Sequence, residues 1–524
     1  MTASKEAMPQ SPPAPLVPAS NDARALVNKL WSYCNVLRDD GVSALDYIEQ
    51  LTFLVFLKMA HEQMHRRIMP IDILGFDAWQ ELLDLEGVEL EVRYTEILGE
   101  LAGRPGVLGR IFKKSQNRIQ DPAKLKRLIR ELIGKEVWAG TNTDVKGDAY
   151  EELLAKGAED VKSGAGQYFT PRALIETMVD CSQPTIHDTV MDPACGTGGF
   201  LLKAFEYIQH HLPVDASQEE KDRLTSGAIL GNELVDATAR LAAMNMVLHG
   251  IAPSSAKTSP ITVGDALAEP PKQHASLVLA NPPFGKKSSV TIISDEEDDF
   301  ERKELTYSRR DFWATTTNKQ LNFVQHIYTL LETYGRAAVV VPDNVLFEGG
   351  VGETVRRRLL QQCDVHTLLR LPTGIFYAGG VKANVLFFEK PPPRQDGKPL
   401  TKTLWVYDFR TNQRFTLKQN PLHRHALNDF VKAYRPGEPR DQRRRTPSFK
   451  PYPVEELLSR DKVSLDLFAD LKDNTLEVTD LNVEPHALAR QIVDELEAAL
   501  SEFASVAEAL RPKGPVTEPG VNNE

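Results

Sequence analysis

The chain has 524 residues, of which 41% are hydrophobic and 26% charged, a composition typical of globular proteins with more than one domain. Its 62 Lys and Arg against 73 Asp and Glu give a net charge of −11, so extensive nucleic-acid binding requires a local basic face or a basic partner. The four cysteines lack CxxC or metal-ligand spacing, and no apolar run reaches the roughly 20 residues of a membrane span. We therefore expect a cytoplasmic protein without structural zinc, disulfides, a signal peptide or membrane contact.

The N-terminal part of the chain is predicted to be helical. Residues 1–20 are rich in Pro, Ala and Ser and predict a disordered tail. Apolar residues at spacings of three and four then predict helices from about residue 21, over 43–64 and over 122–137. Residues 21–147 are thus expected to form a helical domain, in which no pattern indicates chemistry.

Short apolar runs alternate with helical stretches between residues 148 and 393. Continuous apolar strands separated by helices predict an α/β fold with a parallel sheet covered on both faces. A Gly-rich segment between the last two runs favours a hairpin there. The predicted strands are 189–191, 228–230, 276–279, 337–341, 366–369 and 384–388.

The C-terminal part of the chain carries weaker patterns. Residues 394–450 are expected to be an extension and linker, in which Arg443-Arg444-Arg445 is most simply a solvated cluster that could also touch phosphates. Within 451–510, apolar residues at a heptad spacing over 492–510 predict a helix that either covers its own domain or docks on a partner. Residues 511–524 predict a tail.

A glycine-rich turn follows the first predicted strand. The segment from Asp192 to Gly198 reads Asp-Pro-Ala-Cys-Gly-Thr-Gly and leads into a helix. Glycines allow a ligand to approach the backbone closely at the carboxyl end of a strand and the start of a helix. The spacing differs from the GxGxxG of dinucleotide enzymes. A tight structural turn is the alternative interpretation.

Two acidic residues follow later predicted strands. Glu233 can accept hydrogen bonds from both ribose hydroxyls of an adenosine-type ligand, although a surface or capping Glu is an equally simple interpretation. Asp265 can accept a hydrogen bond from an adenine amino group, but Gly-Asp is also a common turn.

The segment Asn281-Pro282-Pro283-Phe284 also follows an apolar strand, and its chemistry is more specific. An amino group on an aromatic ring is a poor nucleophile because its lone pair is delocalised. Two acceptors, the Asn281 side-chain oxygen and the Pro282 carbonyl, can localise that lone pair, and the prolines keep the backbone rigid. Phe284 offers a flat face for a flipped-out base. A proline turn closing the strand is the alternative.

A polar loop precedes the sheet and another follows the tetrad. The loop Gly164-Ala-Gly-Gln-Tyr-Phe-Thr-Pro-Arg172 precedes a helix, with Thr170 as its predicted cap and Pro171 at its first position; ligand contact stays open. Residues 285–318 carry Lys and Arg that could close over DNA, but their acidic run 295–299 argues against simple phosphate binding.

Taken in chain order, from the 164–172 loop through the glycine turn and the two acidic residues to the tetrad, these five segments resemble the modification (methyltransferase) subunits of type I restriction–modification systems. The resemblance covers about residues 22–510 and is strongest from Gly164 to Gly285. It implies a Rossmann-like sheet of the S-adenosylmethionine (SAM)-dependent methyltransferases, with an N-terminal helical domain and a C-terminal helical tail. The implied activity is adenine-N6 methylation of DNA.

The resemblance also implies roles for individual residues. The tetrad Asn281, Pro282, Pro283 and Phe284 would be catalytic and hold the target base. No metal is implied. The residues implied to bind SAM are Gly166, Gln167, Tyr168, Phe169, Thr170 and Pro171 at its methionine end, Asp192, Ala194, Cys195, Gly196, Thr197 and Gly198 beneath it, Glu233 at the ribose, and Asp265 with Ala266 at the adenine.

The implied partners are DNA, a specificity subunit that docks on the C-terminal helix, a second copy of the chain, and an ATP-dependent restriction subunit. The sequence lacks the phosphate loop GxxxxGK[ST], so ATP hydrolysis is not expected of this chain.

Three other functions are alternatives to DNA methylation. An amino-methyltransferase acting on RNA or protein glutamine also fits the tetrad. A non-catalytic scaffold leaves the intact Asn281 without a purpose, and an NAD oxidoreductase leaves the whole tetrad unexplained.

Overall fold

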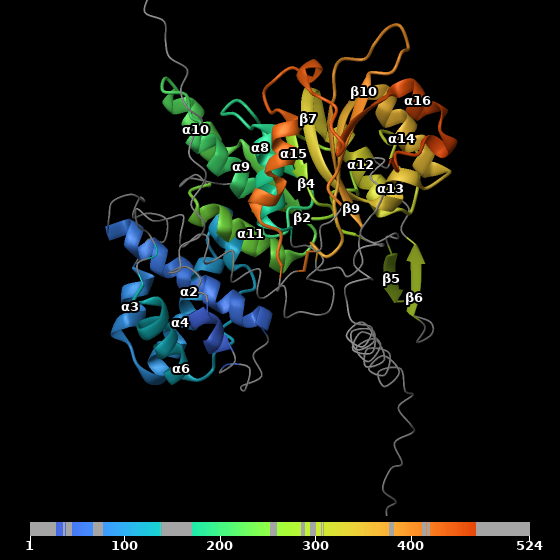
Figure 1. Ribbon diagram of the computed structural model, residues 1–524. Helices are drawn as coiled ribbons and strands as arrows, with labels where there is room; N and C mark the ends of the chain where they lie inside the picture. Colours follow the sequence, from blue (N-terminus) through green and yellow to red (C-terminus); the bar gives the residue numbers. More distant parts are fainter. Residues whose placement is uncertain are drawn as a thin grey trace, which may run out of the picture. The chain divides into compact units, whose positions relative to one another are not determined.

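The computed structural model describes fourteen stretches of the chain (Figure 1), all within one structural unit, Met1–Ala469. The predicted tails, the Gly166–Phe169 run and the 492–510 seam lie outside them. The described residues are 28–34, 37, 44–65, 77–136, 138, 170–251, 259–284, 289–293, 300–304, 307, 309–376, 382–410, 415–416 and 420–467.

The described elements up to residue 133 are all helical, as the apolar spacing predicts. The longest, α2, buries every residue of Leu51–Leu57, because a helix that is apolar on all sides belongs in an interior. Among the described residues, no helix is long and apolar enough to cross a membrane. The helices are α2 (Ala44–His65), α3 (Ala78–Asp84), α4 (Gly87–Ala102), α5 (Gly106–Phe112), α6 (Pro122–Arg127) and the π-helical turn Leu128–Ile133.

A nine-stranded sheet follows, in the order β11-β10-β8-β9-β7-β4-β1-β2-β3. Its strands run parallel from β3 to β7, whereas β9 is antiparallel to both β7 and β8, which confirms the predicted hairpin. The strands are β1 (Val190–Asp192), β2 (Ile229–Glu233), β3 (Ile261–Val263), β4 (Ala275–Ala280), β7 (Leu331–Pro342), β8 (Asp364–Arg370), β9 (Ala383–Glu389), β10 (Thr403–Asp408) and β11 (Phe449–Pro453).

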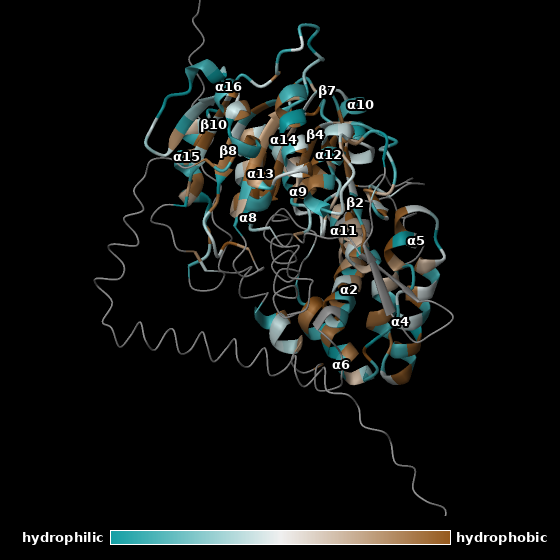
Figure 2. Ribbon diagram, turned by 90° about the vertical axis from the view of Figure 1, so that its right-hand side faces the viewer, coloured by the Kyte–Doolittle hydropathy of each residue, from teal (hydrophilic) through white to brown (hydrophobic). Residues whose placement is uncertain are grey.

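Helices cover both faces of the sheet, and each face has its own core. Strand β4 shows the division, since Leu277 and Leu279 belong to one core and Val278 and Ala280 to the other. Helix α10 is mostly hydrophilic (Figure 2), and Leu224 is its buried residue. The helices are α8 (Arg172–Ser182), α9 (Gly199–His210), α10 (Gln218–Ser226), α11 (Asp236–Leu248), α12 (Lys319–Leu330), α13 (Asp343–Phe347), α14 (Val351–Gln362), α15 (Asn428–Tyr434) and α16 (Val454–Ser459).

The N-terminal helices contact the sheet domain through α11. Arg240 of α11 pairs with Glu49 of α2 at 2.5 Å and donates to the carbonyl oxygen of Lys113. Residues of both regions belong to one continuous apolar core.

The sheet continues beyond Pro393, where the sequence predicts an extension and linker, and that prediction is wrong. Strand β10 lies parallel to β8, and β11 lies antiparallel to β10. Arg443, predicted to be solvated, is buried and donates to the Tyr434 carbonyl and the Thr367 hydroxyl, whereas its neighbours Arg444 and Arg445 are exposed. Its guanidinium stacks 4.6 Å from the Tyr434 ring centroid, so aromatic neighbours replace the water it would otherwise contact.

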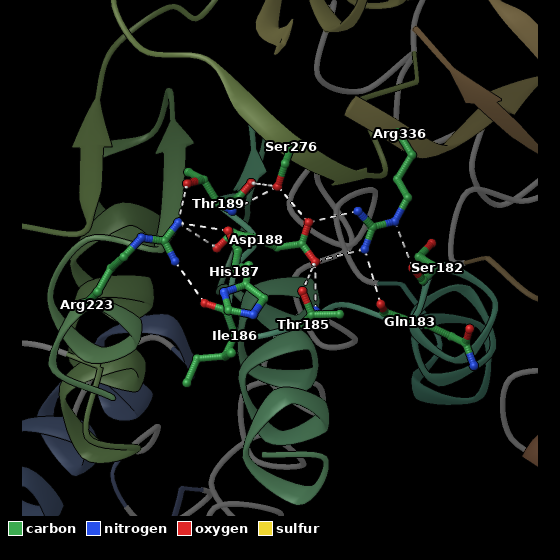
Figure 3. Close-up of polar contacts among 10 residues, drawn as sticks. All are labelled: Ser182, Gln183, Thr185, Ile186, His187, Asp188, Thr189, Arg223, Ser276 and Arg336. Carbon is green, nitrogen blue, oxygen red and sulfur yellow. Dashed lines mark hydrogen bonds and ion pairs between the residues drawn. The ribbon is translucent and has the colours of Figure 1, made fainter. Parts of the chain in front are cut away.

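A polar network joins the starts of β1 and β4 to the middle of β7 (Figure 3). Arg336 of β7 donates two hydrogen bonds to Asp188 at 2.8 and 2.9 Å, and Ser276 of β4 donates a third at 2.7 Å. Arg223 donates to the carbonyl oxygens of Ile186, His187 and Asp188. The network therefore joins three neighbouring strands of the sheet.

The last described segment is anchored by two buried arginines. The guanidinium of Arg356 in α14 donates to the carbonyl oxygens of Lys462 and Val463 within residues 460–467. It also donates to the carbonyl oxygens of Val345 in α13 and of Glu348 just after α13. Arg370 at the end of β8 donates to the Leu467 carbonyl and pairs with Asp466.

The structure describes part of the polar segment 285–318. It contains an antiparallel pair, β5 (Ser289–Ile293) and β6 (Phe300–Glu304). Arg309 is one of the basic residues of this segment that could close over DNA. Its side chain is instead buried, pairs with Asp311 and donates to the Leu267 carbonyl at 3.4 Å.

Candidate active site

Four predicted site residues meet at one edge of the sheet. Asp192, Glu233, Asp265 and Asn281 end or follow β1, β2, β3 and β4, which are parallel neighbours. The strand order reverses between β1 and β4, and ligands of open α/β sheets bind outside the carboxyl ends at such a point.

The turn after β1 is held against the end of β2. The backbone N–H of Gly196 donates to the Glu233 carboxylate at 3.0 Å, and that of Cys195 donates to the Asn232 carbonyl at 2.9 Å. Gly198 has a φ of +91°, and a Cβ there would lie 2.5 Å from the Cε of Met246. The turn thus favours glycine at this position for its left-handed backbone angle, since the terminal methyl of Met246 can move.

The carboxyl groups beneath this turn have perturbed acidities. Burial, together with the nearby Glu233 carboxylate, raises the pKa of Asp192 to about 8, although the N–H of Ala194 partly offsets the shift. Burial also raises the pKa of Glu233. Burial raises the pKa of the Cys195 thiol far above its usual range, so the thiol stays protonated.

Asp265 accepts two hydrogen bonds within the protein. One carboxylate oxygen accepts from the Leu267 N–H at 2.9 Å, and the other accepts from the Tyr307 hydroxyl at 2.6 Å. Tyr307 follows β6, so the segment after the tetrad returns to the end of β3. No periodic pattern in residues 285–318 predicts this contact.

Asn281 is buried, with 7% of its surface exposed, and its amide is oriented by Thr170. The Asn281 Nδ2 donates to the Thr170 hydroxyl oxygen at 2.8 Å. Its Oδ1 is buried and has no hydrogen-bond partner among the residues that the structure describes. The site therefore presents a buried acceptor at the end of β4.

The predicted helix cap at Thr170 is wrong. Helix α8 begins at Arg172 with Pro171 as its N-cap, and no side chain caps it. The Pro171 carbonyl accepts the N–H groups of Leu174 and Ile175, so the hydroxyl of Thr170 is left to contact Asn281.

Phe284 lies beside an aromatic residue that the sequence prediction missed. The rings of Phe284 and Phe376 meet edge to face, with centroids 5.5 Å apart. Phe376 belongs to the Gly-rich segment after β8, which the sequence suggested only as a turn.

Other predicted ligands remain without a structural test. Gly166, Gln167, Tyr168 and Phe169 fall in the stretch 139–169, which the structure does not describe. In the described part of the chain, no group of three His, Cys, Asp or Glu residues could hold a metal ion.

Comparison with known proteins identifies the family. Residues 141–449 match the N-6 DNA Methylase family, and residues 26–73 match the HsdM N-terminal domain. The chain is 37% identical to the type I restriction enzyme StySJI methylase subunit of Salmonella typhimurium and 37% identical to the EcoKI methylase subunit of Escherichia coli, each over 91% of this chain and 94% of the relative.

A solved structure agrees with these sequence relatives. The superposition on the crystal structure of the EcoKI M protein covers 93% of this chain and 97% of that protein, with a TM-score of 0.51 at 32% sequence identity. The chain therefore belongs to the N6-adenine DNA methyltransferase subunits of type I restriction–modification systems.

Proposed function

We propose that Asn281 and the glycine turn form the catalytic centre through which this adenine-N6 DNA methyltransferase acts on a flipped-out base. The observation that carries the proposal is the buried, unpartnered Oδ1 of Asn281 at the carboxyl end of β4. A buried carbonyl oxygen without a partner costs about 1–3 kcal/mol, and an arriving N–H group recovers that energy.

The chain's residues activate the target amino group by orientation. Asn281 Oδ1 and the carbonyl oxygen of Pro282 accept its two N–H bonds, which localises the nitrogen lone pair for attack. Phe284 stacks on the base, and Phe376 supports the Phe284 ring from its edge. The protein needs no covalent intermediate, because positioning and preorganised acceptors lower the barrier.

The residues at the glycine turn fit SAM, which supplies a methyl group bound to a positively charged sulfur. The positive φ of Gly196 and Gly198 opens the backbone at the start of α9. Glu233 is assigned to the ribose, and Asp265 with Ala266 to the adenine. Asp192, Ala194, Cys195 and Thr197 complete the floor, and the residues from Gly166 to Pro171, apart from Thr170, cover the methionine end.

The test is transfer of a labelled methyl group from SAM to DNA by the chain co-expressed with its specificity subunit. We expect the label in N6-methyladenine after digestion of the DNA to nucleosides. Label on RNA or on protein glutamine, with none on DNA, would contradict the proposal.

Phe284→Ala is expected to weaken capture of the flipped base. Loss of one stacking face, worth about 1–3 kcal/mol, should raise the KM for DNA roughly 10- to 100-fold. Phe284→Tyr keeps the ring and should stay close to the parent chain. Unchanged DNA kinetics in the alanine variant would exclude a stacking role.

Binding of SAM near pH 7 is expected to release protons. Asp192, with a pKa of about 8, is largely protonated at that pH, and a cationic ligand lowers the pKa of a nearby carboxyl group. Calorimetry in buffers of different ionisation enthalpy measures the released protons.

S-adenosylhomocysteine, which lacks the sulfonium charge, is the control and should release fewer protons than SAM. Asp192→Asn should remove the difference between the two ligands. Equal proton release by both ligands with the parent chain would refute this role of the buried carboxyl groups.

We further propose that the chain assembles with DNA, a specificity subunit and a second copy of itself, and that a restriction subunit joins this complex. Relatives named as type I restriction enzyme methylase subunits support this assignment. We assign residues 21–147 to a helical domain and 492–510 to docking on the specificity subunit. Action on chromosomal DNA places the protein in the cytoplasm.

A further inference from the structure

The structure connects the loop before the sheet to the tetrad after β4. Thr170 and Asn281 are 111 residues apart in sequence, yet the Asn281 Nδ2 lies 2.8 Å from the Thr170 Oγ1. Both residues are buried, with 6% and 7% of their surface exposed. A hydrogen bond between two buried side chains this far apart in sequence fixes their geometry from two separate segments.

The direction of this hydrogen bond decides which end of the amide is presented. A primary amide donates only through its nitrogen, so donation to Thr170 places Oδ1 at the opposite end. A rotation of the amide by 180° would lose that bond. It would also turn two N–H donors, instead of an acceptor, toward the position that Oδ1 occupies.

We infer that Thr170 is a positioning residue that holds the Asn281 amide with its oxygen toward the target amino group. This inference rests on the proposed function, in which that oxygen accepts an N–H bond of adenine. It differs from the role that the family resemblance implies, which is contact with the methionine end of SAM. The hydroxyl does not cap α8, whose cap is Pro171.

The first test is Thr170→Val in the methyltransferase complex, because valine keeps the shape and removes the acceptor. We expect kcat to fall at least about tenfold, the effect of one lost hydrogen bond, while affinity for S-adenosylhomocysteine stays within about twofold. Thr170→Ser restores an acceptor and should recover most of the lost kcat.

Thr177→Val is the matched control. Thr177 lies in α8, the helix that follows Thr170, is fully buried, and donates its hydroxyl to the Ala173 carbonyl, away from Asn281. We expect it to leave kcat unchanged. A similar fall of kcat in both variants would mean that any buried hydroxyl in or beside α8 matters, which would overturn the inference.

A double-mutant cycle separates positioning from general structural support. If Thr170 acts through Asn281, Thr170→Val should lower single-turnover rates in the parent chain and have no further effect in the Asn281→Ala background. Additive effects of the two substitutions would overturn the inference. Loss of cofactor affinity in Thr170→Val would do the same, because it would make Thr170 a cofactor ligand.

The proposed function and this inference fail in different ways. If Asn281→Ala keeps its turnover, the catalytic role of Asn281 is wrong. If Asn281→Ala is inactive but Thr170→Val turns over like the parent chain, only the positioning role is wrong.

Discussion

We expect Asn281→Ala to lower kcat for methyl transfer about 100- to 1,000-fold. A loss of this size is typical when one preorganised polar group is removed from an active site. The side chain provides a buried acceptor that needs no reorganisation when the amino nitrogen begins to attack. Without it, the amino group keeps its delocalised lone pair. Single-turnover transfer of a labelled methyl group measures the effect.

Cofactor affinity is the control for this substitution. Binding of S-adenosylhomocysteine should stay nearly intact, since the glycine turn is held by Glu233 and Asn232 and not by Asn281. Asn281→Asp keeps an oxygen acceptor and should retain more activity than the alanine variant. Comparable loss of turnover and cofactor binding would instead make Asn281 a structural residue.

Asp188→Ala should reduce the free energy of unfolding by about 3 kcal/mol, as expected when one partner of a largely buried ion pair is removed. The substitution leaves Arg336 without its two carboxylate acceptors and Ser276 without one (Figure 3). These residues join the starts of β1 and β4 to the middle of β7, so the loss affects the centre of the sheet. Denaturant unfolding measures it.

The exposed pair of Asp429 and Lys432 supplies the control. Its carboxylate and ammonium are 3.3 Å apart, but both side chains are largely exposed. Asp429→Ala should therefore change the stability by less than about 1 kcal/mol. Equal losses in the free energy of unfolding from the Asp188 and Asp429 substitutions would show that the network in Figure 3 stabilises the fold no more than an exposed ion pair does.

The contribution of Asp188 should depend on pH in a defined direction. Burial raises its pKa, but hydrogen bonds from Arg336 and Ser276 outweigh burial and lower the pKa to about 2. A depressed pKa stabilises the folded state above the unfolded value near 4, and this stabilisation of about 2 kcal/mol disappears as the pH falls through 2. The Asp188→Asn variant should lack this stabilisation at pH 7 and should be as stable as the parent chain near pH 2.

The strands of the sheet could be predicted because they are buried on both faces. Runs such as 277–279 and 337–341 are continuously apolar, and each lies within a strand of the structure. The polar residues at the strand ends could also be located from the sequence, since Asn281 follows its apolar run directly and Glu233 comes shortly after another. Parallel pairing then brings these ends to one edge.

The edge strands could not be predicted from the same signal. Strand β10 alternates between partly exposed and buried positions, and β11 contains two prolines, Pro451 and Pro453, that weaken a strand pattern. Arg443 looked solvated because its sequence neighbours are charged. Its burial depends on Tyr434 and Thr367, which no local pattern connects to it.

Contacts between distant segments also account for what was missed at the site. The pairing of Thr170 with Asn281, of Tyr307 with Asp265 and of Phe284 with Phe376 each joins residues that are far apart in sequence. A local motif shows which residue types follow a strand. It does not show which side chain from another segment orients them.

The anchoring of residues 460–467 has a mechanical consequence. The guanidinium of Arg356 donates both to carbonyl oxygens of this segment and to the Val345 carbonyl in α13, and Arg370 of β8 donates to the Leu467 carbonyl at its end. A pull on the chain beyond residue 467 must break several charge-assisted hydrogen bonds at once. Tension from that side is therefore borne by the central sheet, and the segment does not peel away residue by residue.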